Sequence, residues 1–151
     1  MAIFRHATKN DASDLSNLAY ASEKHLGYDA EYMNVFADLY NVTAEYISRN
    51  PVDVMEYEGK TIGFWGLREE NRKWELDFFY ITPEYIGKGY GRHLWNHLTD
   101  ECKKRSIHEF QLVTSPQSVL FYQKMGAVVV GQVESMITPG RMIPKLYYPI
   151  R

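Results

Sequence analysis

The sequence predicts a single domain, residues 1–151, of the α/β (α+β) class, in which helices cover both faces of a mixed sheet. Two observations favour this class. Residues 52–81 have the alternation and short polar turns of three consecutive strands. From residue 83 onward, a glycine-rich turn is followed by helical patterns that alternate with further strand patterns. A chain of this length can bury a substantial core.

The composition is that of an ordinary globular protein, with 45% hydrophobic residues, 24% charged residues and a net charge of −2. This charge gives no reason to expect binding to nucleic acid or to anionic membranes. No apolar run approaches the length of a membrane span, and the N-terminus lacks the apolar core of a signal peptide. Cys102 is the only cysteine, which excludes intramolecular disulfides, so we expect a cytoplasmic location. The histidines show no ligand spacing, and we expect no metal site.

The first third of the chain has mainly helical periodicity. After a short strand at 3–6, we expect a helix at 11–22 with Asn10 as its N-cap. A second helical pattern follows at 32–39. Thr43 is expected to cap a short helix at 44–48.

The strand at 74–81 matters most for function, because it leads into the glycine-rich turn. It is the third strand of a meander, after strands at 52–57 and 61–67 that are joined by a turn at Gly59. Side chains of a regular strand alternate between its two faces. We therefore expect one face to carry Trp74, Leu76, Phe78 and Tyr80, and the other face to carry Glu75, Asp77, Phe79 and Ile81.

The remaining elements alternate between helix and strand. We expect a helix at 91–104, a strand at 109–114, a helix beginning at Ser115-Pro116, a buried apolar strand at 127–133 and a last strand at 145–150. Cys102 falls on the apolar stripe of the first of these helices, which indicates a core residue rather than a nucleophile.

The stretch from Pro83 to Leu94 carries glycines at alternate positions, namely Gly87, Gly89 and Gly91. A strand, a glycine-rich turn and a helix in this order expose unpaired amides at a helix N-terminus, which favours phosphate groups. A Walker-type loop is excluded because no Gly-Lys-Ser/Thr triplet follows. A dinucleotide fingerprint fits poorly, because the preceding strands form a meander rather than a βαβ unit.

Two motifs resemble those of the GCN5-related N-acetyltransferase (GNAT) superfamily. Residues 86–91 (Ile-Gly-Lys-Gly-Tyr-Gly) resemble its turn Gln/Arg-x-x-Gly-x-Gly/Ala, with Ile86 departing from the usual Gln or Arg. Residues 115–127, which contain Phe121-Tyr122 and Gly126, resemble the family's next helix. The resemblance implies a mostly antiparallel sheet of about six to seven strands. It also implies an N-acetyltransferase that transfers acetyl from acetyl-CoA to a primary amine by direct attack in a ternary complex.

The resemblance also assigns the cofactor site. It implies that backbone amides of the turn bind the pyrophosphate of acetyl-CoA, and that the backbone of Phe79 and Ile81 pairs with the pantetheine arm. An amide near Phe79 would polarise the thioester carbonyl. The expected cofactor-binding residues are Phe79, Ile81, Ile86, Gly87, Lys88, Gly89, Gly91, Arg92, Ser115 and Tyr122.

Three residues are candidates for catalysis. Tyr122 stands where many relatives place a phenol near the CoA sulfur, as a general acid for the leaving thiolate; the alternative is a core aromatic beside Phe121. An alkyl ammonium, with a pKa of about 10.4, must lose a proton before it attacks. Glu75 or Asp77 is the candidate base, and the alternative for each is a solvated or ion-paired acid.

The acceptor amine is not specified by the sequence. Arg141, in the apolar loop before the last strand, is a candidate for binding a substrate carboxylate or for a structural role. A noncatalytic acyl-CoA-binding module of the same fold is the alternative function, and a homodimer is possible among such proteins.

Overall fold

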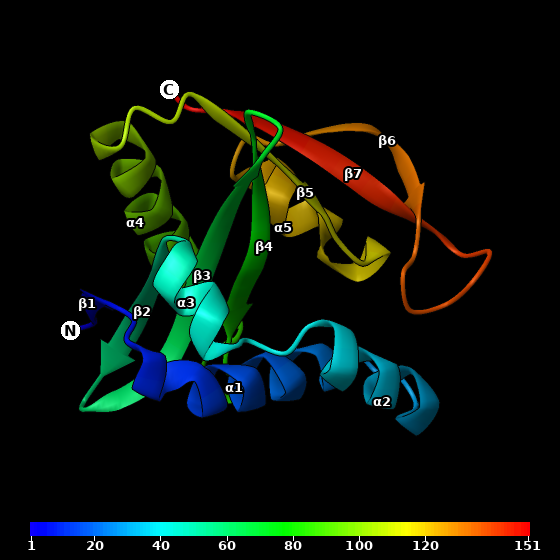
Figure 1. Ribbon diagram of the computed structural model, residues 1–151, viewed down its shortest axis with the longest axis horizontal. Helices are drawn as coiled ribbons and strands as arrows, with labels where there is room; N and C mark the ends of the chain where they lie inside the picture. Colours follow the sequence, from blue (N-terminus) through cyan, green and yellow to red (C-terminus); the bar gives the residue numbers. More distant parts are fainter.

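The computed structural model describes all 151 residues, and its strands form one sheet of seven in the order β1-β2-β3-β4-β5-β7-β6 (Figure 1). The strands are β1 (Ile3–His6), β2 (Val52–Tyr57), β3 (Lys60–Glu70), β4 (Lys73–Ile81), β5 (Glu109–Val113), β6 (Val128–Glu134) and β7 (Met142–Pro149). Every neighbouring pair is antiparallel except β4 and β5. The predicted mixed, mostly antiparallel sheet is therefore confirmed.

The helices begin close to their expected positions. They are α1 (Ala12–Lys24), α2 (Ala30–Leu39), α3 (Ala44–Arg49), α4 (Tyr90–Lys104) and α5 (Val119–Lys124), with short 3-10 turns at Lys9–Asp11, Pro83–Tyr85 and Pro116–Ser118. The Thr43 side chain accepts a hydrogen bond from the amide of Tyr46, as its predicted cap role requires. Asn10 is not the cap of the first helix, because the amide of Thr8 bonds to Asp11 Oδ2 at 2.8 Å and the chain enters α1 through a 3-10 turn.

Two apolar cores lie on opposite faces of the sheet. Helices α1, α2 and α3 bury Leu15, Phe36 and Ile47 against one face. Helix α4 buries Leu94 and Leu98 against the other face, together with side chains of α5. The expected helical cover on both faces is confirmed. None of the helices combines the length and apolarity needed to cross a membrane.

A β-bulge in β4 makes the predicted faces of that strand wrong. Leu76 pairs with Leu67 of β3, and Phe78 pairs with Gly66, so Asp77 is an extra residue with no partner. An extra residue reverses the alternation of the side chains that follow it. Trp74 and Leu76 therefore share the α4 face with Phe79 and Ile81, whereas Phe78 and Tyr80 pack on the α1 face.

The parallel strands β4 and β5 separate soon after they meet. Their register consists of one pair, Glu75 and Gln111. In Figure 1, β5 and β7 slope away from β3 and β4, which makes the separation visible. Beyond the bulge, β4 thus has a ladder partner only on its β3 side.

The strand predicted at 127–133 forms, but the prediction that it is buried was wrong. β6 is the last strand of the sheet and pairs only with β7. Val128, Val129 and Val130 are 53%, 42% and 57% exposed. An apolar run indicates burial only when other elements cover the strand, and here its outer side has no neighbour.

Candidate active site

A cavity of about 580 Å³ brings together the two sequence motifs, the end of β4 and the N-terminal helices. The predicted site residues that line it are Asp77, Phe79, Ile81, Ile86, Gly87, Gly89, Gly91, Arg92, Ser115 and Tyr122. Glu75 and Lys88 are not among its lining residues. The cavity is also lined by Glu23 of α1, Tyr32 and Phe36 of α2, Tyr40 at the C-cap of α2, and Tyr80 of β4.

The glycine-rich turn ends in a helix N-terminus that no side chain caps. Gly87 and Gly89 adopt left-handed conformations with φ of 80° and 89°, and Gly89 is the N-cap of α4. Because Gly89 has no side chain, the first amides of the 15-residue helix α4 have no side-chain partner. These amides and the helix dipole together favour an anionic group at this end of the cavity.

Gly91 connects the two motifs. A Cβ atom built on Gly91 would lie 2.9 Å from Cε1 of Phe121, which belongs to α5. The first turn of α4 and the ring of Phe121 can approach this closely only because residue 91 has no side chain. Lys88, three residues before Gly91, lies with its Nζ 5.8 Å from the centre of the Tyr85 ring.

Tyr122 lines the cavity and belongs to an aromatic cluster with Phe79, Trp95 and Phe121. Its ring centre is 5.9 Å from that of Phe79 on β4 and 5.9 Å from that of Trp95 on α4. Burial raises the pKa of the Tyr122 phenol, and the charge of the Glu23 carboxylate raises it further. The phenol is therefore protonated at neutral pH, and the same shift makes it a weaker acid than an exposed tyrosine.

The two acids predicted on β4 have different surroundings. The side-chain amide of Gln111 donates a hydrogen bond to Glu75, across the one parallel pair of the sheet. Asp77, at the bulge, accepts hydrogen bonds from Arg68 Nε at 2.9 Å and from the Tyr46 hydroxyl at 2.8 Å. Asp77 faces the cavity as one member of an ion pair, and Glu75 lies outside the cavity lining.

Glu23, on α1, is a cavity acid that sequence reasoning missed. Its side chain is buried, with 8% of the residue exposed, and its Oε2 accepts a hydrogen bond from the Tyr32 hydroxyl at 2.7 Å. Burial raises the pKa of this carboxyl, although the Tyr32 hydrogen bond and the charge of Arg141 act in the opposite direction. The sequence did indicate that Glu23 is buried, because it follows Ala19 by four residues and so continues the buried stripe of α1.

Arg141 holds the C-terminal loop against the start of α2. Its Nη2 donates to the Tyr28 hydroxyl at 2.9 Å, and that hydroxyl donates to Ser115 Oγ at 2.6 Å. The ring of Tyr28 stacks on that of Tyr32 at 3.7 Å, and Tyr32 bonds to Glu23. Two hydrogen-bonded groups, joined by the stacked rings of Tyr28 and Tyr32, therefore connect Glu23 to the second motif and to the C-terminal loop.

The family model of the GNAT acetyltransferases matches residues 14–127, a range that contains both motifs, Glu23 and the whole of β4. The chain belongs to the GNAT acetyltransferase family. The family resemblance inferred from the two motifs is thereby confirmed. Members of this family are acyltransferases that use acetyl-CoA. No relative among curated proteins matches the sequence significantly.

Solved structures with a similar fold include other GNAT acetyltransferases. The PaiA N-acetyltransferase of Thermoplasma acidophilum, in complex with coenzyme A, has 23% identity and a TM-score of 0.83, with 99% of each chain covered. YncA of Salmonella typhimurium, with acetyl-CoA, has 20% identity and a TM-score of 0.72, with 100% of this chain and 95% of that chain covered. The ribosomal-protein-S18-alanine N-acetyltransferase of Escherichia coli has 17% identity and a TM-score of 0.73, with 99% and 94% covered. These likenesses establish the GNAT fold of this chain.

Proposed function

We propose that this GNAT protein transfers the acetyl group of acetyl-CoA to a primary amine by direct attack in a ternary complex. The observation that carries the proposal is the composition of the cavity that both motifs line. The lining combines an uncapped helix N-terminus at the glycine-rich turn with a buried phenol, Tyr122, and a buried carboxylate, Glu23. An anion site, an acid and a base are the groups that amine acetylation by a phosphate-bearing thioester needs.

The donor is assigned to the glycine-rich turn and β4. Amides of Gly87, Lys88, Gly89, Gly91 and Arg92 bind the pyrophosphate in this proposal, supported by the uncapped N-terminus of α4. The pantetheine arm lies along β4 beyond the bulge, where β5 has separated from it.

The backbone of Phe79 and Ile81 then pairs with the amides of the pantetheine arm, as a further strand would. An amide near Phe79 would polarise the thioester carbonyl. Ile86 and Ser115 line the same cavity and complete the proposed cofactor contacts.

The proposed step requires one proton to leave the amine and one to reach the departing sulfur. The amine nitrogen attacks the thioester carbonyl carbon, the carbon–sulfur bond breaks, and the products are an amide and free CoA. Tyr122 donates its proton to the departing thiolate, whose thiol has a pKa of about 8.5. Cys102 is buried in the core away from the cavity lining, which agrees with transfer without a covalent enzyme intermediate.

We assign the proton acceptor to Glu23 in preference to Glu75 and Asp77. An acid with a raised pKa is a better base near neutral pH, and burial raises the pKa of Glu23. Asp77 is engaged by Arg68 and by the Tyr46 hydroxyl, and Glu75 lies outside the lining. The aromatic rings beside Glu23 also favour an ammonium group before its deprotonation.

The first test separates cofactor binding from turnover. Acetyl-CoA at 100 times its dissociation constant is expected to raise the melting temperature by about 5–10 °C. Thiol release is then followed over a panel of amines, polyamines, amino acids and peptides. The absence of a thermal shift with any acyl-CoA would refute the cofactor assignment. Binding without turnover on any acceptor would instead favour a noncatalytic acyl-CoA-binding module.

The second test uses isosteric variants. Tyr122→Phe and Glu23→Gln are each expected to lower kcat by about 100-fold or more and to keep the acetyl-CoA thermal shift. Tyr147→Phe is the matched control, because the half-buried Tyr147 on β7 bonds to Glu109 and lies outside the cavity. In the wild type, kcat/KM is expected to rise with pH as Glu23 ionises, and this limb should disappear in Glu23→Gln. Undiminished kcat in Tyr122→Phe would remove the general acid from the mechanism.

A further inference from the structure

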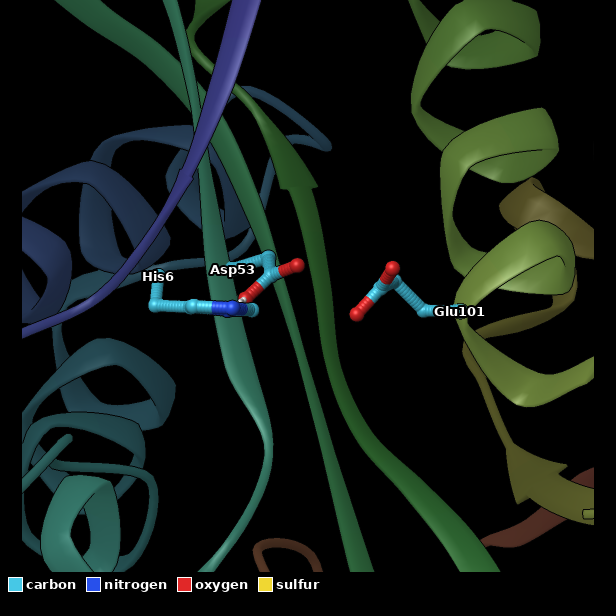
Figure 2. Close-up of side chains that lie close together, drawn as sticks. All are labelled: His6, Asp53 and Glu101. Carbon is cyan, nitrogen blue, oxygen red and sulfur yellow. Dashed lines mark hydrogen bonds and ion pairs between the residues drawn. The ribbon is translucent and has the colours of Figure 1, made fainter. Parts of the chain in front are cut away.

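A second polar cluster lies between the sheet and α4 and includes no residue that lines the acetyl-transfer cavity. Figure 2 shows Glu101 reaching from α4 toward Asp53 of β2, with His6 of β1 beside Asp53. One imidazole nitrogen of His6 and one carboxylate oxygen from each acid, the atoms that could ligate a metal ion, all lie within 4.8 Å of one another. His6 Nδ1 donates a hydrogen bond to Asp53 Oδ1 at 2.6 Å.

The sheet and the helix each place their part of the cluster. His6 and Asp53 are direct partners in the antiparallel pairing of β1 and β2, so their side chains point to the same face of the sheet. Glu101 follows His97 by one turn of α4, so both point toward the sheet. No spacing in the sequence indicates the cluster, because successive members lie 47 and 48 positions apart. The pairing of β1 with β2 brings His6 to Asp53, and the packing of α4 against the sheet brings Glu101 to both.

The charges in this cluster are poorly compensated. Asp53 is 2% exposed and Glu101 is 8% exposed, so two buried carboxylates face each other within 4.8 Å. Like charges at this distance repel each other, and burial strengthens the repulsion. The ion-pair partners of Asp53 are the imidazoles of His6 and His97. The lysine partner of Glu101, Lys104, reaches it at 3.2 Å with a side chain that is mostly exposed.

We propose that His6, Asp53 and Glu101 bind a divalent first-row transition-metal ion, with Zn²⁺ as the reference ion. One imidazole nitrogen and two carboxylate oxygens are ligands that such ions accept, and two carboxylates balance the charge of the ion. Metal–ligand bonds of about 2.0–2.2 Å set ligand atoms roughly 3 to 3.5 Å apart. Small side-chain movements from the present arrangement reach this spacing. His6 is 75% exposed in its side chain, which leaves an open path from solvent.

A hydrogen-bonded chain behind the ligands orients Asp53. Trp65 Nε1 donates to His97 Nδ1 at 3.1 Å, so the proton of the neutral His97 ring is on Nε2. This Nε2 faces the second carboxylate oxygen of Asp53 at 3.6 Å, and the ring of Phe4 stacks on His97 at 4.0 Å. His97 is therefore a positioning residue rather than a ligand. Support of this kind behind a ligating carboxylate is typical of metal sites.

The test is to titrate the metal-free full-length protein with ZnCl₂ in a non-chelating buffer and to measure the heat of binding by calorimetry. We expect one Zn²⁺ per chain, and a rise in melting temperature of about 5–10 °C at 100 times the dissociation constant. His6→Ala and Glu101→Gln should each weaken the site by at least about tenfold. Co²⁺ provides a second readout, because its visible absorption bands should appear in the wild type and be lost in both variants.

His25→Ala is the matched control, since His25 is exposed at the end of α1 on the other face of the sheet, and it should bind like the wild type. Should Glu101→Gln fail to fold, His6→Ala decides, because its mostly exposed side chain contributes little to the core. Absence of saturable binding, or unchanged affinity in the His6 variant, would overturn the proposal.

Discussion

Replacing Gly63 by alanine tests how closely β3 approaches β4 at the end that leads into the glycine-rich turn. Gly63 pairs with Ile81, the last residue of β4. A Cβ atom at this position would lie 2.8 Å from Cδ1 of Ile81 and 2.9 Å from the carbonyl oxygen of Tyr80. The Ile81 methyl can rotate away, but the backbone carbonyl cannot move without shifting β4.

The expected loss follows from two opposing contributions. Overpacking costs about 1–3 kcal/mol, and the Gly→Ala change stabilises by about 0.4–1 kcal/mol because it restricts the unfolded chain. The net loss is at most about 2.6 kcal/mol and about 1.3 kcal/mol at mid-range, and a domain of this size loses about 2–4 °C in melting temperature per kcal/mol. We therefore expect Gly63→Ala to melt below the wild type, by about 3–5 °C at mid-range and by at most about 10 °C.

Gly131→Ala is the matched control. It is also a strand glycine, but a Cβ atom there meets nothing within 4 Å and its φ is not left-handed. Only the effect on the unfolded chain remains, so a rise of about 1–4 °C is expected. Calorimetry or dye-monitored melting measures both variants. A Gly63→Ala protein at least as stable as the wild type would refute the close approach of the two strands.

Two further predictions concern single residues. Burial raises the pKa of Cys102 to about 12, so its thiol should not react with a disulfide reagent in the native protein and should react once guanidinium unfolds it; prompt reaction of the native protein would contradict its core position. The hydrogen bonds of Arg5 hold the pKa of Asp11 below its usual range, so this pair stabilises the fold above the aspartate pKa of the unfolded chain, about 3.9. The melting-temperature advantage of the wild type over Asp11→Asn should therefore be present at pH 6 and fade as the pH falls below about 4; an advantage that persists at pH 2 would have another cause.

Local patterns in the sequence sufficed for most of the fold. The meander, the helix after the glycine-rich turn and the cap at Thr43 depend on neighbouring residues, and each was predicted. The bulge at Asp77 was not, because an extra residue in a strand has no signature without knowledge of the partner strand. The exposure of β6 depends on its place at the sheet edge, which only the order of the strands determines.

The residues of the cavity and of the His6–Asp53–Glu101 cluster were predicted only where they belong to or adjoin a local sequence motif. Tyr122 was identified through a motif of adjacent residues, and it lines the cavity. Glu23 belongs to the same cavity but comes from a helix almost 100 residues earlier, so only the packing of α1 against the sheet brings it there. His6 and Asp53 meet across two strands that the sequence separates by three helices.

The contact between Gly91 and Phe121 packs the two family motifs directly against each other, so neither can move independently. The glycine-rich turn rests directly on Phe121, the residue next to Tyr122. A larger side chain at position 91 would push the ring of Phe121, and with it α5, the helix that carries Tyr122. Among relatives of this chain, the sizes of these two residues should therefore change together, since neither motif can be exchanged without refitting the other.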